Sequence, residues 1–381
     1  MLQNIFASSA ALFSFILSYS QGIDSTKKLA DTTTAKTPPP VTITGSVDGY
    51  YRYNFNAPSG KTNNYTSFTN SQSSFELGMA SLRADHSFGK VGATADLGFG
   101  RRAEEFSYND FGHQTLFAVK QLFVTFQASG KIKFTMGKWG THIGYEVVDA
   151  YANRNYSMDY MFSYGPFFHT GIKADITLSS TTALMVGIAN PTDFSTTTSG
   201  TKVAIAQFST STKDGKWKFY LNYQGYGGGS RDDSTLSPYY ILYKSLNQFD
   251  LVINGTVSSK FSIGFNGTIQ SVNSSTLDKS ASWWGSALYL NLDPSSKIGF
   301  TLRGEYFSDK DGVKINPVDP AQVPGLNVFD LTLTGLFKPA ANLTIMPELR
   351  LDNGSKNFFY KSDNTYTKST VSALLAAVYH F

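Results

Sequence analysis

The sequence contains no cysteine, which excludes disulfide bonds, thiol catalysis and thiolate metal sites. Charged residues are scarce, at 16% of the chain against a usual share of about 25%. Outside the amino terminus, no stretch offers the ~18 consecutive apolar residues that a transmembrane helix needs. The net charge of +4 is small and no Lys/Arg cluster stands out, so we expect no nucleic-acid partner. What the chain has instead is 30 Phe, 22 Tyr and 33 Gly in 381 residues.

The amino terminus reads as a targeting segment. Residues 5–19 form an apolar run, with Ser18 and Ser20 before Gln21, which predicts a signal peptide over residues 1–20. No Lys or Arg precedes Lys27, so a short membrane anchor is the alternative. Residues 21–40 are polar and end in a proline run, which predicts a disordered periplasmic tail.

From Val41 onward, apolar and polar residues alternate with the period of β-strands. Successive side chains of a strand point to opposite faces, so each strand has one apolar and one polar face. A lipid-facing Lys or Arg at mid-bilayer costs about 2–4 kcal/mol, which would keep charges off the apolar face. In ten clear segments the charged residues all fall on the polar parity: Asp48, Arg52, Asp96, Lys173, Asp175, Lys218, Asp250, Lys297, Arg303, Glu305, Asp330, Glu348, Arg350 and Asp352.

The strands are separated by gaps that are alternately short and long, as in outer-membrane barrels with tight periplasmic turns and long extracellular loops. We therefore predict an all-β fold, a transmembrane antiparallel β-barrel over residues 41–381 with about sixteen strands, fourteen or eighteen being possible. An even number places both termini in the periplasm. The predicted strands are 41–55, 74–88, 91–101, 114–128, 131–139, 168–178, 181–190, 201–211, 216–225, 246–257, 260–271, 281–293, 296–308, 327–339, 342–352 and 369–381.

Some segments fit this pattern badly. Lys120 would face lipid unless a β-bulge shifts the register. Trp283 and Trp284 are adjacent, which leaves the parity of their strand open, and the parity of 181–190 and 201–211 is equally ambiguous. Pro347 falls on an apolar face and removes one donor from the strand ladder.

The chain ends on an alternating apolar strand with Tyr379 and the terminal Phe381. A terminal aromatic residue on such a strand resembles the signal by which the barrel-insertion machinery recognises its substrates in the bacterial outer membrane. We therefore expect that machinery and outer-membrane lipid as partners.

The longest connection, residues 139–167, is the third of the long external loops and carries Glu146, Asp149, Arg154 and Asp159. A barrel of about sixteen strands is too wide for its side chains to fill. We hypothesise that this loop folds into the lumen as a constriction. Opposed charges across a narrow gap would then filter solutes by size and dipole. A loop that caps the barrel outside is the alternative. The predicted pore wall consists of Arg52, Arg83, Arg303, Glu305 and Arg350.

The same region resembles the hallmark of the OmpL-like β-barrel porin family of Bacteroidetes. The resemblance rests on Gly144-Tyr145-Glu146, on Asn153, on Asn155-Tyr156-Ser157 and on residues 166–171, Pro-Phe-Phe-His-Thr-Gly. It implies an outer-membrane barrel and suggests a pore. Asp159 and Met161 depart from the residues expected there.

Other chemistry finds little support. The five His residues lack ligand spacing, and we expect His169 to be a hydrogen-bonding wall residue. Residues 224–229, Gln-Gly-Tyr-Gly-Gly-Gly, are followed by no helix and read as an external loop. No acid–base constellation appears, so we expect neither an enzyme nor a cofactor or metal. The predicted function is passive transport of small hydrophilic solutes or ions through an outer-membrane porin, with a second copy of the chain, in a homo-oligomer, as a candidate partner. A plugged barrel that serves as scaffold or docking partner of a surface or secretion complex is the alternative.

Overall fold

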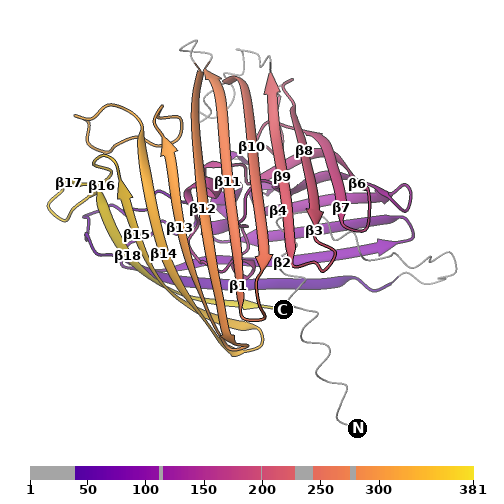
Figure 1. Cartoon of the computed structure of the whole chain (residues 1–381), viewed down its shortest axis with the longest axis horizontal. Helices are drawn as coiled ribbons and strands as arrows, with labels where there is room; N and C mark the ends of the chain where they lie inside the picture. Colours follow the sequence, from indigo (N-terminus) through magenta and orange to yellow (C-terminus); the bar gives the residue numbers. More distant parts are fainter. Residues whose placement is uncertain (1–38, 111–114, 199, 228–242, 275–279) are drawn as a thin grey trace, which may run out of the picture.

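The computed structural model describes residues 39–110, 115–198, 200–227, 243–274 and 280–381. The predicted signal peptide and nearly all of the predicted tail lie outside these residues. Within them the chain forms one closed antiparallel barrel (Figure 1). Its sixteen strands confirm the predicted fold class. They are β1 (Thr42–Asn54), β2 (Ser74–Phe88), β3 (Val91–Phe99), β4 (Val119–Gln127), β5 (Ile132–Gly140), β6 (Phe168–Thr177), β7 (Thr182–Ala189), β8 (Val203–Ser211), β9 (Trp217–Gly227), β10 (Tyr243–Thr256), β11 (Phe261–Ser274), β12 (Ser280–Ser295), β13 (Ile298–Asp309), β14 (Leu326–Ala340), β15 (Leu343–Gly354) and β18 (Ser369–His380).

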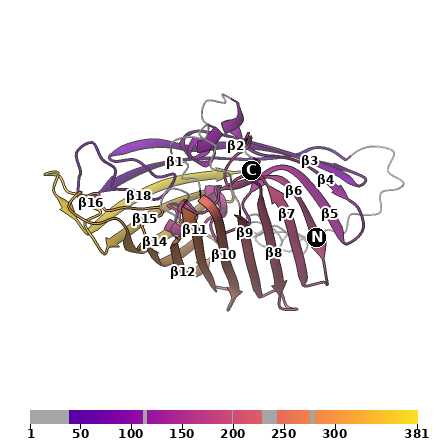
Figure 2. The same cartoon turned by 90° about the horizontal axis from the view of Figure 1, so that it is seen from above.

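Each strand pairs with its neighbour in sequence, and β1 closes the ring against β18. The closing pair is extended by two backbone hydrogen bonds between Gly45 and Phe381, at 3.0 and 2.9 Å. Closure is required in lipid, because an open sheet edge would leave N–H and C=O groups without partners. Seen from above, β1–β3 lie on one side and β8–β12 on the other (Figure 2).

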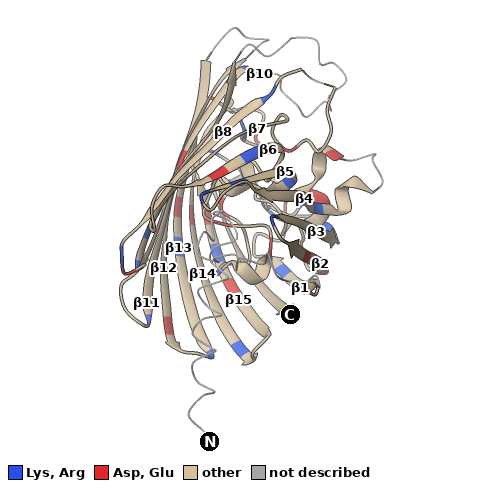
Figure 3. Cartoon of the chain, turned by 90° about the vertical axis from the view of Figure 1, so that its right-hand side faces the viewer, with Lys and Arg blue, Asp and Glu red and all other residues tan. Residues whose placement is uncertain are grey.

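Alternation separates the two faces of the wall as the sequence predicts. Leu349 is 54% exposed and points outward, whereas its neighbour Arg350 is 4% exposed and points inward. Phe300 and Arg303 show the same contrast on β13. Charged positions are spaced along the strands in Figure 3. The outer surface is therefore an apolar band suited to acyl chains, and the inner surface is polar.

Connections differ between the two ends of the barrel. At one end, here called the tight-turn end, strands follow one another closely, as from Phe88 to Val91 and from Ala340 to Leu343. The long connections leave the wall at the other end, the long-loop end, and within the described residues they contain the short elements. These are α2 (Arg101–Phe106), η1 (Tyr108–Asp110), η2 (Leu116–Ala118), η3 (Ala150–Ala152), α3 (Tyr160–Tyr164), β16 (Phe359–Tyr360) and β17 (Tyr366–Thr367). None of the helices in the described ranges is long and apolar enough to cross a membrane.

The residues that fit the predicted alternation badly have local structural explanations. Between β3 and β4 the register shifts, so that Asp96 pairs with Gln121 and Leu97 with Val119. Lys120 is the extra residue of this bulge and points inward, where its Nζ lies 3.3 Å from Asp96. Trp283 is buried inside and Trp284 is 44% exposed outside, which fixes the parity of β12.

The sequence does not show which residues of β7 and β8 face inward, and this has a different cause. Met185, Val203 and Ile205 are apolar but point inward, where they pack against Trp139. Apolar residues therefore occur on both faces of these strands, and alternation becomes weak. Pro347 does lie on the outer face, opposite Leu375.

Candidate constriction site

Residues 141–167, which connect β5 to β6, form a segment that we call the inner loop. It leaves the wall at Gly140 and hydrogen-bonds to inward-facing residues of β13, β14 and β15. In the ring order these strands lie about halfway round from β5 and β6. The inner loop therefore crosses the lumen to the opposite wall, and most of its side chains are buried.

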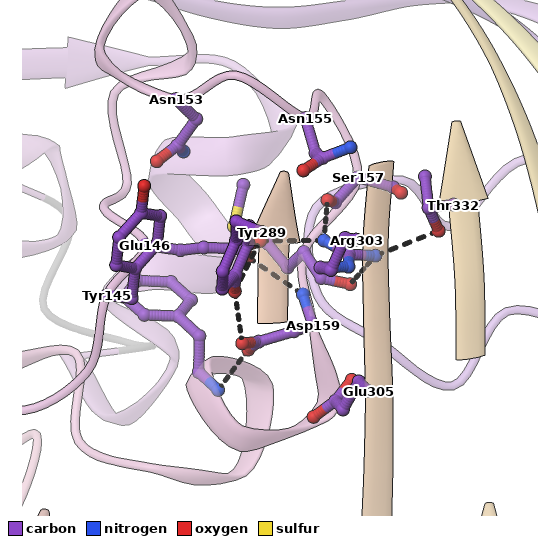
Figure 4. A network of polar contacts seen from close by, with 12 residues as sticks. Tyr145, Glu146, Asn153, Asn155, Ser157, Asp159, Tyr289, Arg303, Glu305 and Thr332 are labelled. Carbon is purple, nitrogen blue, oxygen red and sulfur yellow. Dashed lines mark hydrogen bonds and ion pairs between the residues drawn. The ribbon is translucent and has the colours of Figure 1, made fainter. Parts of the chain in front are cut away.

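An ion pair between loop and wall lies at the centre of the site (Figure 4). Arg303 Nη1 lies 2.7 Å from Glu146 Oε1, and Arg303 Nε lies 3.2 Å from Asp330. Tyr289 on β12 donates its hydroxyl to Asp159 at 2.8 Å and contacts Glu146 at 3.2 Å. All of these side chains are buried, so removal of any one partner leaves a polar or charged group without compensation.

Wall carboxylates also hold the backbone of the inner loop. Glu305 on β13 accepts the N–H groups of Tyr160 and Met161 at 2.7 and 2.9 Å. Glu348 on β15 accepts the N–H of Tyr156 at 2.9 Å. In the opposite sense, Arg350 donates to the carbonyl of Met158 at 2.7 Å. Charge-assisted bonds of this kind are stronger than neutral ones, so the loop backbone is fixed at several points.

Further contacts hold the loop between these points. Arg154 pairs with Asp293 at 2.9 Å, at the tight-turn side of β12. Asp149 pairs with Lys120 of the β4 bulge at 2.5 Å. Tyr156 donates its hydroxyl to Asp48 on β1 at 2.5 Å. The bulge that moves Lys120 off the lipid face thus also supplies an anchor for the loop.

Inward-facing glycines make room for the loop side chains. A Cβ at Gly264 would lie 2.5 Å from the ring of Tyr145, and one at Gly285 would lie 2.6 Å from the side chain of Met161. A Cβ at Gly78 would meet the Tyr156 hydroxyl at 2.6 Å. Real Cβ contacts do not approach so closely, so a larger residue at these wall positions would displace the loop.

The inner loop has a narrow neck. Asp159 donates its backbone N–H to Glu146 Oε2 at 2.8 Å, which brings the two ends of residues 146–159 together. Within this segment the Asn153 side chain bonds to both the N–H and the carbonyl of Val147, at 3.0 and 2.6 Å. The Asp159 carboxylate also caps α3 through the N–H of Phe162 at 2.6 Å. Residues 147–158 therefore form a compact excursion from a fixed neck.

Burial shapes the electrostatics of the loop. Desolvation is the largest effect on Glu146, and with the neighbouring Asp159 carboxylate it raises the pKa of Glu146 to about 8, against the opposing effect of Arg303. Asp193, on the connection between β7 and β8, accepts the N–H groups of Phe167 and Phe168 at 2.7 and 2.9 Å. Burial raises its pKa to about 7, although these hydrogen bonds act in the opposite sense.

The structure brings together most of the residues singled out in the sequence. Glu146, Asp159, Arg303, Glu305 and Arg350 form one buried network, and Asp149 and Arg154 anchor the loop on either side of it. The remaining two wall arginines lie elsewhere.

Arg52 donates to the carbonyls of Thr62 and Ser71, both at 2.8 Å, and so holds the connection between β1 and β2. Arg83 pairs with Asp85 at 2.6 Å. The sequence predicted opposed charges that face each other across an open gap. Glu146 and Arg303 are instead in direct contact.

Several residues of the site escaped sequence reasoning, namely Asp48, Lys120, Tyr156, Tyr289, Asp293, Asp330, Glu348 and the wall glycines. For Asp48, Asp330 and Glu348, the alternation in the sequence does predict that the side chain points inward, but not that it contacts the loop. At the carboxy terminus, Tyr379 and Phe381 are 45% and 50% exposed on the outer face, with ring centroids 6.1 Å apart. Across the described ranges, no group of three or more His, Asp or Glu side chains is arranged to hold a metal ion.

The family model described as "Putative beta-barrel porin-2, OmpL-like" matches residues 40–381. No curated protein matches the sequence. The outer membrane channel DcaP of Acinetobacter baumannii shares the fold with a TM-score of 0.59 at 12% identity, over 91% of this chain and 99% of that one. The anion-selective porin from Comamonas acidovorans gives 0.59 at 10% identity, over 90% and 99%. OprB of Pseudomonas putida gives 0.59 at 13% identity, over 90% and 94%.

Proposed function

Because the chain belongs to the OmpL-like β-barrel porin-2 family, we propose that it lets small hydrophilic solutes diffuse through a barrel narrowed by its inner loop. Porins of known structure share its fold in the outer membrane. We further propose that the tight-turn end and both termini face the periplasm, and that the long-loop end faces outside. The tight turns and the exposed terminal Phe381 support this orientation.

The observation that carries the proposal is the attachment of the inner loop across the lumen. A barrel of sixteen strands is wide enough to enclose water, so its effective bore depends on what occupies the interior. The loop is bound to the wall by the Glu146–Arg303 pair and by Glu305 and Glu348. Fixed anchors of this kind would keep a passage beside the loop at a defined width, which selection of solutes by size requires.

A specific observation favours the second candidate, a plugged barrel that serves as scaffold or docking partner. Side chains of the loop and the wall form apolar clusters inside the barrel, with Tyr160, Trp283 and Phe307 in one of them. Between the loop and β4 there is a cavity of only about 40 Å³, lined by Lys120 and Asp149 among others. Dense packing of this kind suits a static plug.

Planar-bilayer recording separates the two. The purified barrel should give stepwise ion current, with a reversal potential under a salt gradient that reports charge selectivity. Folded protein that inserts but passes no current, and that copurifies with a stable partner, would reject the porin in favour of the scaffold.

The narrow neck permits a sharper test. Deletion of residues 147–158, with a two-glycine linker between Glu146 and Asp159, should leave the Glu146–Arg303 and Asp159–Tyr289 contacts in place because the neck is already closed. The single-channel conductance should rise if the excursion narrows the passage. As a control, shortening of the exposed turn 361–365 between β16 and β17, which lies outside the inner loop, should leave the conductance unchanged. Equal conductance in both variants would remove the inner loop from the passage.

A further inference from the structure

A cavity of about 450 Å³ lies at the long-loop end, above the inner loop. Its floor is formed by residues 163–167, which follow the constriction site directly. Its walls come from β9, β10, β11 and four of the long connections. The volume lies within the range of about 300–1,000 Å³ that small-molecule sites occupy, and a solute entering from this end would meet the cavity before the neck.

Tyrosine dominates the lining. Tyr108, Tyr164, Tyr226 and Tyr243 reach the cavity from four different segments. Three of their hydroxyls are oriented by hydrogen bonds: from Tyr164 to the carbonyl of Tyr65 at 2.7 Å, from Tyr108 to Asp193 at 3.2 Å, and from Tyr226 to the carbonyl of Tyr243 at 3.4 Å. Tyrosine offers a broad apolar ring together with a polar tip, so it can contact both the C–H face and the hydroxyl groups of one ligand.

An amide array supplies the matching polar surface. Gln270 on β11 lines the cavity and bonds to Gln248 at 2.9 Å, and Gln248 bonds in turn to Gln224 at 2.8 Å. The Gln270 carbonyl also accepts the indole N–H of Trp283 at 3.0 Å. A glutamine amide has two N–H donors and two acceptor lone pairs, so Gln270 retains capacity for a ligand beyond these bonds.

The charged groups around the cavity are largely engaged with one another. Glu105 accepts the N–H of Phe68 at 2.6 Å and pairs with Arg101 at 3.2 Å. Asp193 is committed to Phe167 and Phe168, and it also interacts electrostatically with Lys314. Lys314 also interacts electrostatically with Asp309. Glu105 and Asp193 therefore already have hydrogen-bond or ion-pair partners, whereas Lys314 carries an ammonium group that interacts electrostatically with two carboxylates.

From this lining we infer that the cavity is a binding site for a small neutral saccharide. The site deepens the proposed function by naming a solute class, and it rests on that function only for the claim that the bound sugar is in transit. Cations would be attracted to the tyrosine faces, but the carboxylates of Glu105 and Asp193 already have partners and offer no free counterion. Anions would find a single ammonium group, shared with two carboxylates. A polyhydroxylated neutral ring uses both the tyrosine faces and the glutamine amide.

Binding is measured on the folded, full-length barrel in detergent micelles, by saturation-transfer NMR and calorimetric titration with glucose and maltose. Glucuronate and glucosamine serve as anionic and cationic counterparts. The neutral sugars should bind more tightly than both. Tyr226→Leu and Tyr243→Leu should each weaken binding by about two- to tenfold, the effect of one aromatic contact. Tyr366→Leu is the matched control, since Tyr366 lies in the β16–β17 hairpin outside the cavity lining, and it should leave binding unchanged.

Other outcomes overturn the assignment. Tighter binding of glucuronate, lost in Lys314→Met, would make the cavity an anion site. Equal loss of sugar binding in Tyr366→Leu, or no loss in either cavity variant, would place the sugar elsewhere. Conductance in bilayers without sugar binding in micelles would refute the saccharide site and leave the porin intact. Sugar binding without conductance would refute the porin and leave the saccharide site intact. Heat-modifiable gel mobility verifies that each variant is folded.

Discussion

Arg303 on β13 and Glu146 on the inner loop form a buried ion pair at 2.7 Å, and this pair joins the wall of the barrel to the segment that crosses its lumen. The Arg303 guanidinium also donates to the carbonyl of Ser157 at 2.7 Å and pairs with Asp330. One wall residue thus holds two parts of the loop and neutralises a second wall residue.

Replacement of Arg303 by methionine should therefore be strongly destabilising. Above about pH 8, where Glu146 is ionised, its carboxylate would be buried without a counterion, which costs about 3–5 kcal/mol in the free energy of unfolding, whereas Asp330 would keep Arg350 at 2.7 Å. Denaturant unfolding in micelles, followed by tryptophan fluorescence, measures the loss. Arg83→Met is the matched control, because Arg83 pairs with the partly exposed Asp85, and we expect a loss of about 1 kcal/mol or less. Equal losses in the two variants would contradict a special role of the buried pair.

The pH should alter the attachment of the inner loop. The pKa of Glu146 rises from 4.5 to about 8 in the folded protein. A carboxyl with a raised pKa stabilises the folded state fully below its unfolded pKa, and this stabilisation is lost as the pH rises through the folded pKa. Anchoring by Glu146 should therefore weaken between about pH 4.5 and pH 8, with larger and noisier single-channel currents above pH 8. Glu146→Gln should remove the part of the pH dependence centred near pH 8 and leave the part due to Asp193, whose pKa is about 7. An unchanged pH profile in Glu146→Gln would show that Glu146 does not cause the dependence.

The wall glycines provide a steric test. Gly264→Leu should push Tyr145 and its loop away from β11 and raise conductance, with a loss of stability of about 1–3 kcal/mol from overpacking. Gly304→Leu is the control on a neighbouring part of the wall, because a Cβ there would meet only Leu331, at 3.9 Å. A displaced loop predicts a change in the first variant alone, and identical conductance in both would show that Tyr145 does not hold the loop in the passage.

The terminal aromatic residue should matter more in cells than in the test tube. Phe381→Ala removes one exposed ring that packs beside Tyr379, so refolding of the purified chain into micelles should change little. If Phe381 is the insertion signal, the amount of assembled barrel in the outer membrane should fall several-fold. Phe300→Ala, at another outward position, should leave assembly unchanged. Equal effects of the two substitutions in cells would reduce Phe381 to an ordinary lipid-facing residue.

Most of the barrel could be predicted because burial between lipid and lumen imposes a two-residue period on each strand. The period became unreadable where the inner face is also apolar, as at Met185 and Val203, and where a bulge inserts Lys120. The sequence does not predict the helix α2 either, because the predicted strand 91–101 extends past the end of β3 at Phe99 and into the first residue of the helix.

The candidate site was harder to predict than the fold. Parity shows that Arg83 and Arg303 both point inward, but it gives neither their height in the wall nor their place around the ring. Of these two, Arg303 contacts the inner loop and lies opposite its origin, whereas Arg83 pairs with Asp85. Gly264 has no side chain, so the alternation of polar and apolar residues does not show which face of the strand it lies on. Its close contact with the loop therefore cannot be predicted from the sequence.

The inner loop also has a mechanical consequence. It is continuous with β5 and β6 and is bonded to β13 and β15 on the far side of the ring. A hollow cylinder resists lateral pressure poorly, whereas one with a strut across its diameter keeps its cross-section round. Cutting this strut should therefore soften the whole tube to flattening by the surrounding bilayer, far beyond the residues that are removed.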